Sequence, residues 1–157
     1  MTISVLRPGL LTTVQDRGRH GHQHLGLCPG GAMDPITLGL ANALVGNDLG
    51  EAALEITILG PELEFAQDTL VALCGAEFLG GFPRQRPVLM AAGARLSIGR
   101  AERGARAYLA VAGGFAIAPV LGSRSTYLPG RFGGFEGRAL RRGDVLPLDK
   151  KVAEISR

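Results

Sequence analysis

The sequence contains no tryptophan and only two cysteines, and aromatic residues make up just 5% of its 157 residues. Cys28 and Cys74 each stand alone among small or apolar neighbours, which predicts reduced thiols and excludes both a disulfide framework and a cysteine-rich metal site. No run of 18 apolar residues occurs, and Pro8, Gly9 and Asp16 interrupt the apolar N-terminal stretch. The chain is therefore expected to be cytoplasmic, with no membrane span and no signal peptide.

Basic residues are missing from a long internal stretch, because no Lys or Arg lies between Arg19 and Arg84. Eight acidic residues fall in that stretch: Asp34, Asp48, Glu51, Glu55, Glu62, Glu64, Asp68 and Glu77. From Arg84 onward basic residues predominate, but they lie among glycines and prolines, with no basic helix and no interleaved aromatic platform. This pattern argues against nucleic acid and favours a small ligand that carries a carboxylate or phosphate, which the arginine fork can bind.

Glycine, in contrast, is abundant: the 157 residues include 24 glycines, about twice the usual share of roughly 7%. Because glycine is unfavourable inside helices and strands, this abundance predicts short strands joined by tight turns and excludes a helical bundle. Strands are expected at residues 2–6, 10–14, 53–59, 62–65, 69–74, 87–91, 94–98, 105–112 and 144–148. The pattern predicts a mainly β protein with a closed or nearly closed β barrel.

One clear α-helix is predicted at about 35–46. Asp34 is a good N-cap, Pro35 suits the first helical position, and Gly46 ends the periodic pattern. The apolar residues expected to share its buried face are Ile36, Leu40 and Leu44. We expect this face to pack on a sheet and Asn42 to lie on another face.

Residues 15–26 (QDRGRHGHQHLG) concentrate one acid, two arginines and three histidines directly after a predicted strand. His20, His22 and His24 alternate, so that on a strand three imidazoles would share one face and could bind zinc. Two interspersed glycines argue against a regular strand, and the sequence places no fourth ligand. We therefore expect no metal, and interpret the segment as a polar loop or a substrate-contacting loop.

Residues 121–144 form a second candidate, with hydroxyl groups at Ser123, Ser125 and Thr126 around Arg124. Hydroxyls, a guanidinium and glycine N–H groups can form an anion pocket, although a structural loop stabilised by local Ser/Thr turns is equally consistent. The segment lacks the residue order of a phosphate-binding P-loop and of a Gly-x-Ser-x-Gly elbow. Since both candidates hold arginine in glycine-rich loops after strands, we expect residues 15–26 and 121–134 to form one functional surface.

Several ordered motifs resemble one family over nearly the whole chain. They are GLLTTVQDRGRHGHQHLG (9–26), GGAMDPITLGLANALVGN (30–47), ALEITILGPELEF (53–65), GARAYLAVAGGF (104–115), and LGSRSTYL (121–128) with GGFEGRALRRGD (133–144). The chain is similar to the N-terminal half of the biotin-dependent carboxyltransferase-like family, which includes the C subunit of 5-oxoprolinase, allophanate hydrolase subunit 2 and the carboxyltransferase domain of urea amidolyase. The resemblance implies a cyclophilin-like closed β barrel over residues 1–149, followed by a polar C-terminal tail at 150–157.

The resemblance implies a component of an ATP-dependent 5-oxoprolinase that is similar to its C subunit. This enzyme hydrolyses the lactam of 5-oxoproline to glutamate with companion subunits. ATP would act through the complex, and no cofactor would be bound directly. One alternative is a carboxyltransferase that acts on urea or a related amide with carboxybiotin, and another is a non-catalytic regulatory partner of a kinase-inhibitor-like protein. Because half of the family's length is missing, the isolated chain is expected to be inactive, and its uncovered apolar surface to favour homo-oligomers.

Roles can be placed on the positions that match the family. The candidate catalytic residues are Asp16, Arg17 and His24. The candidate substrate-binding residues are Gln15, Asn42, Gly113, Gly114, Ser123, Arg124, Ser125 and Thr126. Arg17 or Arg124 would hold the substrate carboxylate, and the Asp16 and His24 pair would supply acid–base capacity. The two glycines would donate backbone N–H groups to the carbonyl oxygen of the lactam as it gains charge.

Overall fold

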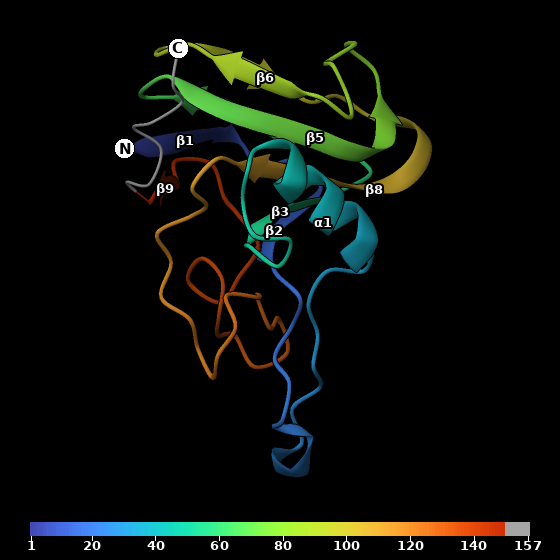
Figure 1. Cartoon of the computed structure of the whole chain (residues 1–157), viewed down its shortest axis with the longest axis vertical. Coiled ribbons are helices and arrows are strands. Elements are labelled where there is room, and N and C mark those ends of the chain that lie inside the picture. The colour runs from blue at the N-terminus through green and yellow to red at the C-terminus, as the bar shows by residue number, and fades with distance from the viewer. Residues whose placement is uncertain (150–157) are drawn as a thin grey trace.

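The computed structural model describes residues 1–149, in which two antiparallel sheets and one α-helix form the body of the protein (Figure 1). The strands are β1 (Thr2–Arg7), β2 (Leu11–Gln15), β3 (Ala53–Thr57), β4 (Glu62–Phe65), β5 (Thr69–Phe78), β6 (Pro87–Met90), β7 (Arg95–Ser97), β8 (Ala101–Val111) and β9 (Val145–Pro147). The helix α1 spans Pro35–Leu44, and a 3₁₀ helix, η1, spans Gln23–Leu25. The prediction of a mainly β protein with one α-helix is confirmed, and the predicted tail lies outside the described residues.

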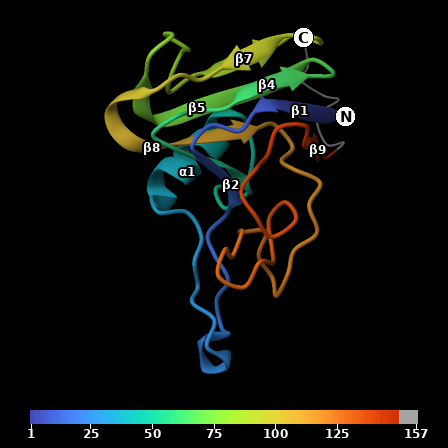
Figure 2. The same ribbon diagram turned by 180° about the vertical axis from the view of Figure 1, so that it is seen from behind.

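The strands pair into two separate sheets. One sheet has the order β7-β4-β1-β9 and the other has the order β2-β3-β8-β5-β6, with antiparallel pairing throughout. Figure 2 shows the four-stranded sheet from its outer side. Within residues 1–149 the hydrogen-bonded strands therefore do not form the predicted closed barrel. The described fold consists of two separate sheets.

Tight glycine corners carry the chain from one sheet to the other. The turn between β1 and β2 meets the turn between β3 and β4, where Leu10 N–H donates to the Leu59 carbonyl at 3.0 Å. Gly9 has a φ of +75°, and its Cα lies so close to the Leu59 carbonyl that no Cβ would fit. Gly60 packs against Ile98 in the same way. These corners explain part of the glycine content, since only glycine permits such close backbone contact.

The main core lies between the two sheets. It is built from alternate residues of the strands, among them Ile3 of β1, Leu54 and Ile56 of β3, and Phe65 of β4, all fully buried. The intervening residues of the five-stranded sheet face α1 on the other side of that sheet and are mostly small: Ala53, Ala72, Cys74, Tyr108 and Ala110. This alternation is the period of two expected for a sheet that is covered on both faces.

The helix is oriented differently from the sequence-based prediction. The residues that α1 buries are Leu38, Gly39, Ala41 and Asn42, whereas Ile36 and Leu40, expected in the core, are 84% and 45% exposed. The prediction was wrong because α1 is apolar on both sides, and because the Asn42 side chain has partners that allow its burial. Asn42 Nδ2 donates to the Glu51 carbonyl at 2.7 Å, and its Oδ1 accepts from Asn47 at 3.0 Å.

The helix begins and ends near the predicted residues. The Asp34 carboxylate accepts the N–H of Thr37 at 3.0 Å, and the last helical residue is Leu44, two residues before the predicted end. Hydrogen bonds from Thr37, first from its side chain and then from its backbone, hold the pKa of Asp34 below its ordinary value. Within residues 1–149 no helix is long and apolar enough to cross a membrane.

The two faces of α1 provide a matched pair of substitutions. Leu38→Ala should lower the free energy of unfolding by about 2–5 kcal/mol, because it opens a cavity under the helix. Ile36→Ala should change it by less than about 0.5 kcal/mol, because Ile36 makes little contact with the body. Urea denaturation of both variants measures the difference, and equal losses would contradict the observed orientation.

Candidate functional site

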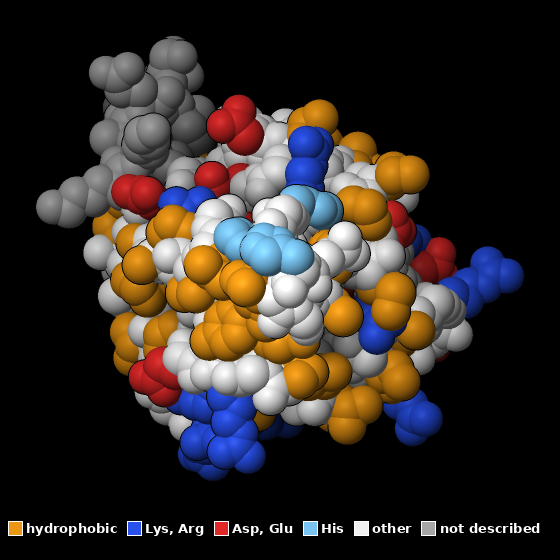
Figure 3. Space-filling view, turned by 90° about the horizontal axis from the view of Figure 1, so that it is seen from below, with side chains coloured by type: hydrophobic (Ala, Val, Ile, Leu, Met, Phe, Trp, Pro, Cys, Tyr) orange, Lys and Arg blue, Asp and Glu red, His pale blue; other side chains and the backbone are white. Residues whose placement is uncertain are grey.

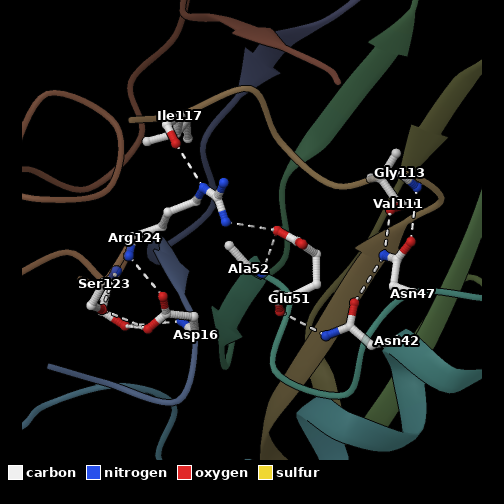
Figure 4. A network of polar contacts seen from close by, with 11 residues as sticks. Asp16, Asn42, Asn47, Glu51, Ala52, Val111, Gly113, Ile117, Ser123 and Arg124 are labelled. Carbon is white, nitrogen blue, oxygen red and sulfur yellow. Dashed lines mark hydrogen bonds and ion pairs between the residues drawn. The ribbon is translucent and has the colours of Figure 1, made fainter. Parts of the chain in front are cut away.

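The carboxylate of Asp16, directly after β2, binds the segment 123–125 of the second candidate loop (Figure 4). Oδ1 accepts hydrogen bonds from the hydroxyls of Ser123 and Ser125, both at 2.6 Å, and Oδ2 accepts from the backbone N–H of Arg124 at 2.7 Å. Oδ1 also accepts the N–H of Gly18 at 2.8 Å. The base of the first loop and the segment 123–125 are therefore joined, as predicted.

The guanidinium of Arg19 binds the same segment through its carbonyl groups. Arg19 is almost fully buried, at 1% exposure. Its Nη2 donates to the carbonyls of Ser123 and Ser125 at 3.1 and 3.0 Å, and its Nε donates to the Val120 carbonyl at 2.7 Å. The guanidinium also lies 4.9 Å from the centre of the Phe132 ring. Carbonyl oxygens and the face of an aromatic ring together stabilise this buried positive charge.

The remaining polar residues of this region are also engaged within the protein. Thr126 bonds the Val14 carbonyl through both its backbone N–H and its hydroxyl, at 2.9 and 3.0 Å. Gln15 Nε2 donates to Thr13 Oγ1 at 3.0 Å, whereas the buried Gln15 Oε1 has no partner in residues 1–149. The hydroxyls of Ser123, Ser125 and Thr126 are thus buried and position the loop, and their predicted contact with substrate stays a prediction.

Arg124 directs its side chain away from this buried cluster (Figure 4). Its Nε donates to the Ile117 carbonyl at 2.7 Å, and its Nη1 lies 3.3 Å from Glu51 Oε1. One third of the side chain is exposed, and Nη2 has no hydrogen-bond partner in residues 1–149. The loop therefore presents one partly exposed guanidinium beside one carboxylate.

Glu51 is the site residue that the sequence analysis missed. Its Oε1 accepts the N–H of Ala52 at 3.1 Å and faces Arg124, and it packs against Gly114, where a Cβ would lie 2.9 Å from the carboxylate carbon. Asn42 binds the Glu51 carbonyl at 2.7 Å from α1. Glu51 belongs to the stretch between Arg19 and Arg84 that contains no basic residue. An acid in this stretch can form an ion pair only with a base that is remote in sequence, and this was the one signal in the sequence that could have pointed to Glu51.

The predicted role of Gly113 and Gly114 is contradicted by their hydrogen bonds. Gly113 N–H donates to Asn47 Oδ1 at 2.8 Å, and Gly114 N–H donates to the Val111 carbonyl at 2.9 Å. Asn47 in turn donates to the Val111 carbonyl at 2.8 Å, which closes the turn after β8 (Figure 4). Both N–H groups are therefore already bonded within the protein and are not free to stabilise an oxyanion.

His24 does not lie beside Asp16. It belongs to η1, at the end of a hairpin that projects from the body (Figures 1 and 2). The hairpin has a narrow base, where a Cβ on Gly31 would lie 2.6 Å from Gly18 N and where Ala32 N–H donates to the Asp16 carbonyl at 2.8 Å. The predicted acid–base pair is wrong, because Asp16 is bonded at the base of the hairpin while His24 is exposed at its end.

The three histidines gather at the exposed end of this hairpin (Figure 3). His20 Nε2 is 3.0 Å from the Arg17 carbonyl. In residues 1–149 no group of three His, Cys, Asp or Glu side chains is arranged to hold a metal ion.

Arg17 lies against the loop that precedes β3. A Cβ on Gly50 would lie 3.1 Å from Arg17 Cδ, and Gly50 is followed directly by Glu51. Arg17 is exposed, and its guanidinium has no hydrogen-bond or ion-pair partner among the described residues. Arg17 therefore lies against Gly50, and Arg124 pairs with the next residue, Glu51.

Comparisons with known proteins agree over almost the whole chain. The family model described as "Carboxyltransferase domain, subdomain A and B" matches residues 25–157. The chain is 44% identical to the C subunit of the Escherichia coli 5-oxoprolinase over 153 residues, which cover 94% of this chain and 49% of that protein. It is 41% identical to the urea amidolyase of Saccharomyces cerevisiae over 150 residues, covering 92% of this chain and 8% of that protein.

Among solved structures, the urea amidolyase of K. lactis superposes with a TM-score of 0.90 at 41% identity, over 94% of this chain and 9% of that chain. The chain thus spans about half the length of the 5-oxoprolinase protein that it matches, and a small part of the urea amidolyases.

Asp16→Asn tests whether this carboxylate holds the two loops together. The amide matches the carboxylate in size, but its NH₂ group would face a donor, the N–H of Arg124 or the serine hydroxyls. Since hydrogen bonds to charged groups contribute about 1.5–3 kcal/mol each, we expect a loss of about 2–3 kcal/mol in the free energy of unfolding. Hydrogen exchange at residues 123–126 should accelerate. The control Asp48→Asn changes an exposed acid, and equal behaviour of the two variants would refute the role.

Proposed function

Because the chain belongs to the carboxyltransferase domain (subdomain A and B) family, we propose that it is a component of an ATP-dependent 5-oxoprolinase, equivalent to part of its C subunit. Such an enzyme opens the lactam of 5-oxoproline to glutamate, and this chain would act with companion subunits in the cytoplasm. The observation that carries the proposal is the 44% identity to the E. coli protein over 153 residues. The proposal concerns only those residues of the site that lie in this chain. We also propose that the two sheets correspond to the cyclophilin-like barrel of the family.

Arg124 is the residue we assign to the carboxylate of the substrate. Its guanidinium is partly exposed, and the bonds of Asp16 to its backbone fix its position before any substrate arrives. A guanidinium can bind a carboxylate through two parallel hydrogen bonds, which orients the substrate as well as holding it. In the substrate-free protein Glu51 partly neutralises this charge at 3.3 Å, and a substrate carboxylate would compete with it.

Glu51 replaces Asp16 as our candidate acid–base group. Hydrolysis of the lactam adds water to the carbonyl carbon, breaks the C–N bond and delivers a proton to the departing nitrogen. Asp16 accepts four hydrogen bonds from within the protein, so we assign it to positioning. Glu51 is partly exposed beside Arg124 and has the carboxylate that such a proton transfer needs.

Two features argue against ATP binding by the described residues. The N-terminus of α1, the position where phosphates bind in many folds, is already occupied by the Asp34 carboxylate, and Pro35 contributes no N–H there. The sequence also lacks a P-loop. We therefore assign ATP to a companion protein of the complex and derive no step that involves it.

Carboxyl transfer to urea or a related amide is the second candidate. It is favoured by the 41% identity to urea amidolyase and by the TM-score of 0.90 with the K. lactis protein. In this reading Arg124 would orient the carboxyl group carried by carboxybiotin. The regulatory role beside a kinase-inhibitor-like protein stays a prediction, as does self-association of the chain.

The first test of this function is activity. The 157-residue chain alone should release no glutamate from 5-oxoproline and ATP, because it covers half of the related E. coli protein. A chimera in which this chain replaces the matched half of that protein should release glutamate when the E. coli companion subunits are added. Turnover by the isolated chain, or an inactive but folded chimera, would contradict the proposal, and carboxylation of urea in the same assay would favour the second candidate.

The same chimera tests the two charged residues. Arg124→Ala should raise the KM for 5-oxoproline about tenfold to a hundredfold, the factor expected for a charge-assisted bond of about 1.5–3 kcal/mol. Glu51→Gln should lower kcat, because it removes the proton-transfer group while it relieves competition for Arg124. Arg142→Ala, which changes an exposed arginine without a partner in residues 1–149, is the control. An unchanged KM in Arg124→Ala would remove this residue from the site.

A further inference from the structure

Three glycine corners of the two sheets meet around a pocket that the proposed function does not use. They are the turn from β1 to β2, the turn from β3 to β4 and the turn from β7 to β8. Their residues in the wall of the pocket are Pro8 and Gly9, Leu59 and Gly60, and Ile98 and Gly99. The volume of the pocket is about 310 Å³. Small-molecule sites span roughly 300–1,000 Å³, so the pocket has room for a small ligand.

The pocket lies at the opposite end of β2 and β3 from the Arg124 site. β2 begins after Gly9 and ends before Asp16, while the antiparallel β3 begins after Glu51 and ends before Leu59. Because a strand rises about 3.3 Å per residue, these strands separate the pocket from Glu51 by roughly 20 Å. A ligand in the pocket would therefore not contact the Arg124 site, and the two sites can be tested separately.

Two residues in the wall of the pocket have a free backbone donor. They are Gly9 and Gly99, which are both half-buried and whose N–H groups make no hydrogen bond within residues 1–149. The neighbouring carbonyl groups are in contrast occupied. The Leu59 carbonyl accepts the N–H of Leu10 at 3.0 Å, and the carbonyl of Gly99 itself accepts the N–H of Gly60 at 2.9 Å. A wall with free donors and occupied acceptors favours a ligand that accepts hydrogen bonds.

The polar side chains that line the pocket, Arg7 and Ser97, add further donors. Arg7 Nε and Nη2 both bond a single oxygen of Glu62, Oε2, at 2.7 and 2.6 Å, which leaves Nη1 without a partner within residues 1–149. The Ser97 hydroxyl, on the strand residue paired with Glu62, also has no partner in this part of the chain. No acidic residue is among the described residues that line the pocket. The charge and the free donors thus fit an anion.

The backbone at one corner of the pocket is strained. Ile58, directly before Leu59, has a φ of +63°, a conformation that a β-branched residue rarely adopts. Strand β8 holds it there, because the Ile58 N–H donates to the Ala105 carbonyl at 2.8 Å and the Ile58 carbonyl accepts the N–H of Ala101 at 2.7 Å. Strain of this kind is concentrated at sites that bind ligands. The Leu59 wall is thus fixed before any ligand arrives.

We propose that this pocket binds a small aliphatic monocarboxylate. The carboxylate would accept hydrogen bonds from Arg7 Nη1 and from the N–H groups of Gly9 and Gly99. The short alkyl chain would lie against the apolar wall formed by Leu59 and Ile98. Inorganic phosphate would meet the same donors but would gain nothing from the apolar wall. The proposal does not depend on the 5-oxoprolinase activity, because it concerns the other end of the fold.

Titration of the isotope-labelled chain with butyrate, followed by NMR, tests the pocket directly. An Arg124→Ala background removes binding at the proposed substrate site. The amide signals of Gly9 and Gly99 should shift downfield together and saturate, because each N–H group gains a charged acceptor. Butyramide, which lacks the charge, and inorganic phosphate, which lacks the alkyl chain, should each bind at least about tenfold more weakly.

Two arginines of the four-stranded sheet give a matched pair of variants. Arg7→Ala should weaken butyrate binding at least about tenfold, because it removes the positive charge that lines the pocket. Arg95→Ala is the control, because Arg95 has a similar side-chain exposure, 63% against 68%, and pairs with Glu64 on the same sheet but lies outside the pocket. Loss of either exposed ion pair should change the thermal unfolding temperature equally little, so only butyrate binding separates the two variants.

Ser97→Leu tests the space itself. It should fill the pocket and abolish butyrate binding, while the fold is kept because Ser97 is exposed. Equal binding of butyrate by Arg7→Ala and Arg95→Ala, or equal binding of butyrate and butyramide, would overturn the proposal. So would butyrate-induced shifts around Arg17 with Gly9 and Gly99 unchanged, since the carboxylate would then bind at that exposed arginine. None of these measurements depends on catalysis, so failure of this site is distinguishable from failure of the proposed function.

Discussion

Two opposite charges on one short loop hold this site together. Asp16 binds the hydroxyls of Ser123 and Ser125 and the N–H of Arg124, while Arg19 binds the carbonyls of the same two serines from within the body. Each charge is satisfied by dipoles and not by the other charge, so removal of one would leave strongly polar groups without partners in a poorly solvated place. This arrangement fixes the backbone of Arg124 and directs its side chain outward, where it can meet a ligand.

The Arg124 side of the site depends on a different part of the fold. Glu51 is placed by Asn42 of the helix and lies against Gly114 after β8. The ion pair of Arg124 and Glu51 therefore joins loops that are separated by more than seventy positions in sequence. A change in how the helix sits on its sheet would move Glu51 relative to Arg124. Packing at α1 and the electrostatics of the Arg124–Glu51 pair are coupled in this way.

The sequence predicted those features that depend on local rules. Asp34 and Pro35 start the helix as expected, and the first loop meets the second because both follow strands that end at the same side of the body. The buried face of α1 was mispredicted because the two faces of the helix are similarly apolar. The hydrogen bonds of Asn42 to Glu51 and Asn47, which lie outside the helix, determine which face is buried. Glu51 was missed for the same reason, since its partner is remote in sequence.

The end of the projecting hairpin can change in sequence and length without loss of the site. Its two arms meet at Gly18 and Gly31, and the bond from Ala32 to the Asp16 carbonyl seals the base. Arg19 lies just beyond this closure and belongs to the clamp, but residues 21–28 make no hydrogen bond to the Asp16 cluster within the described part of the chain. Insertions, deletions or a proteolytic cut between residues 20 and 28 would leave the loop clamp intact, so this tip is free to diverge in evolution while the residues at its base are not.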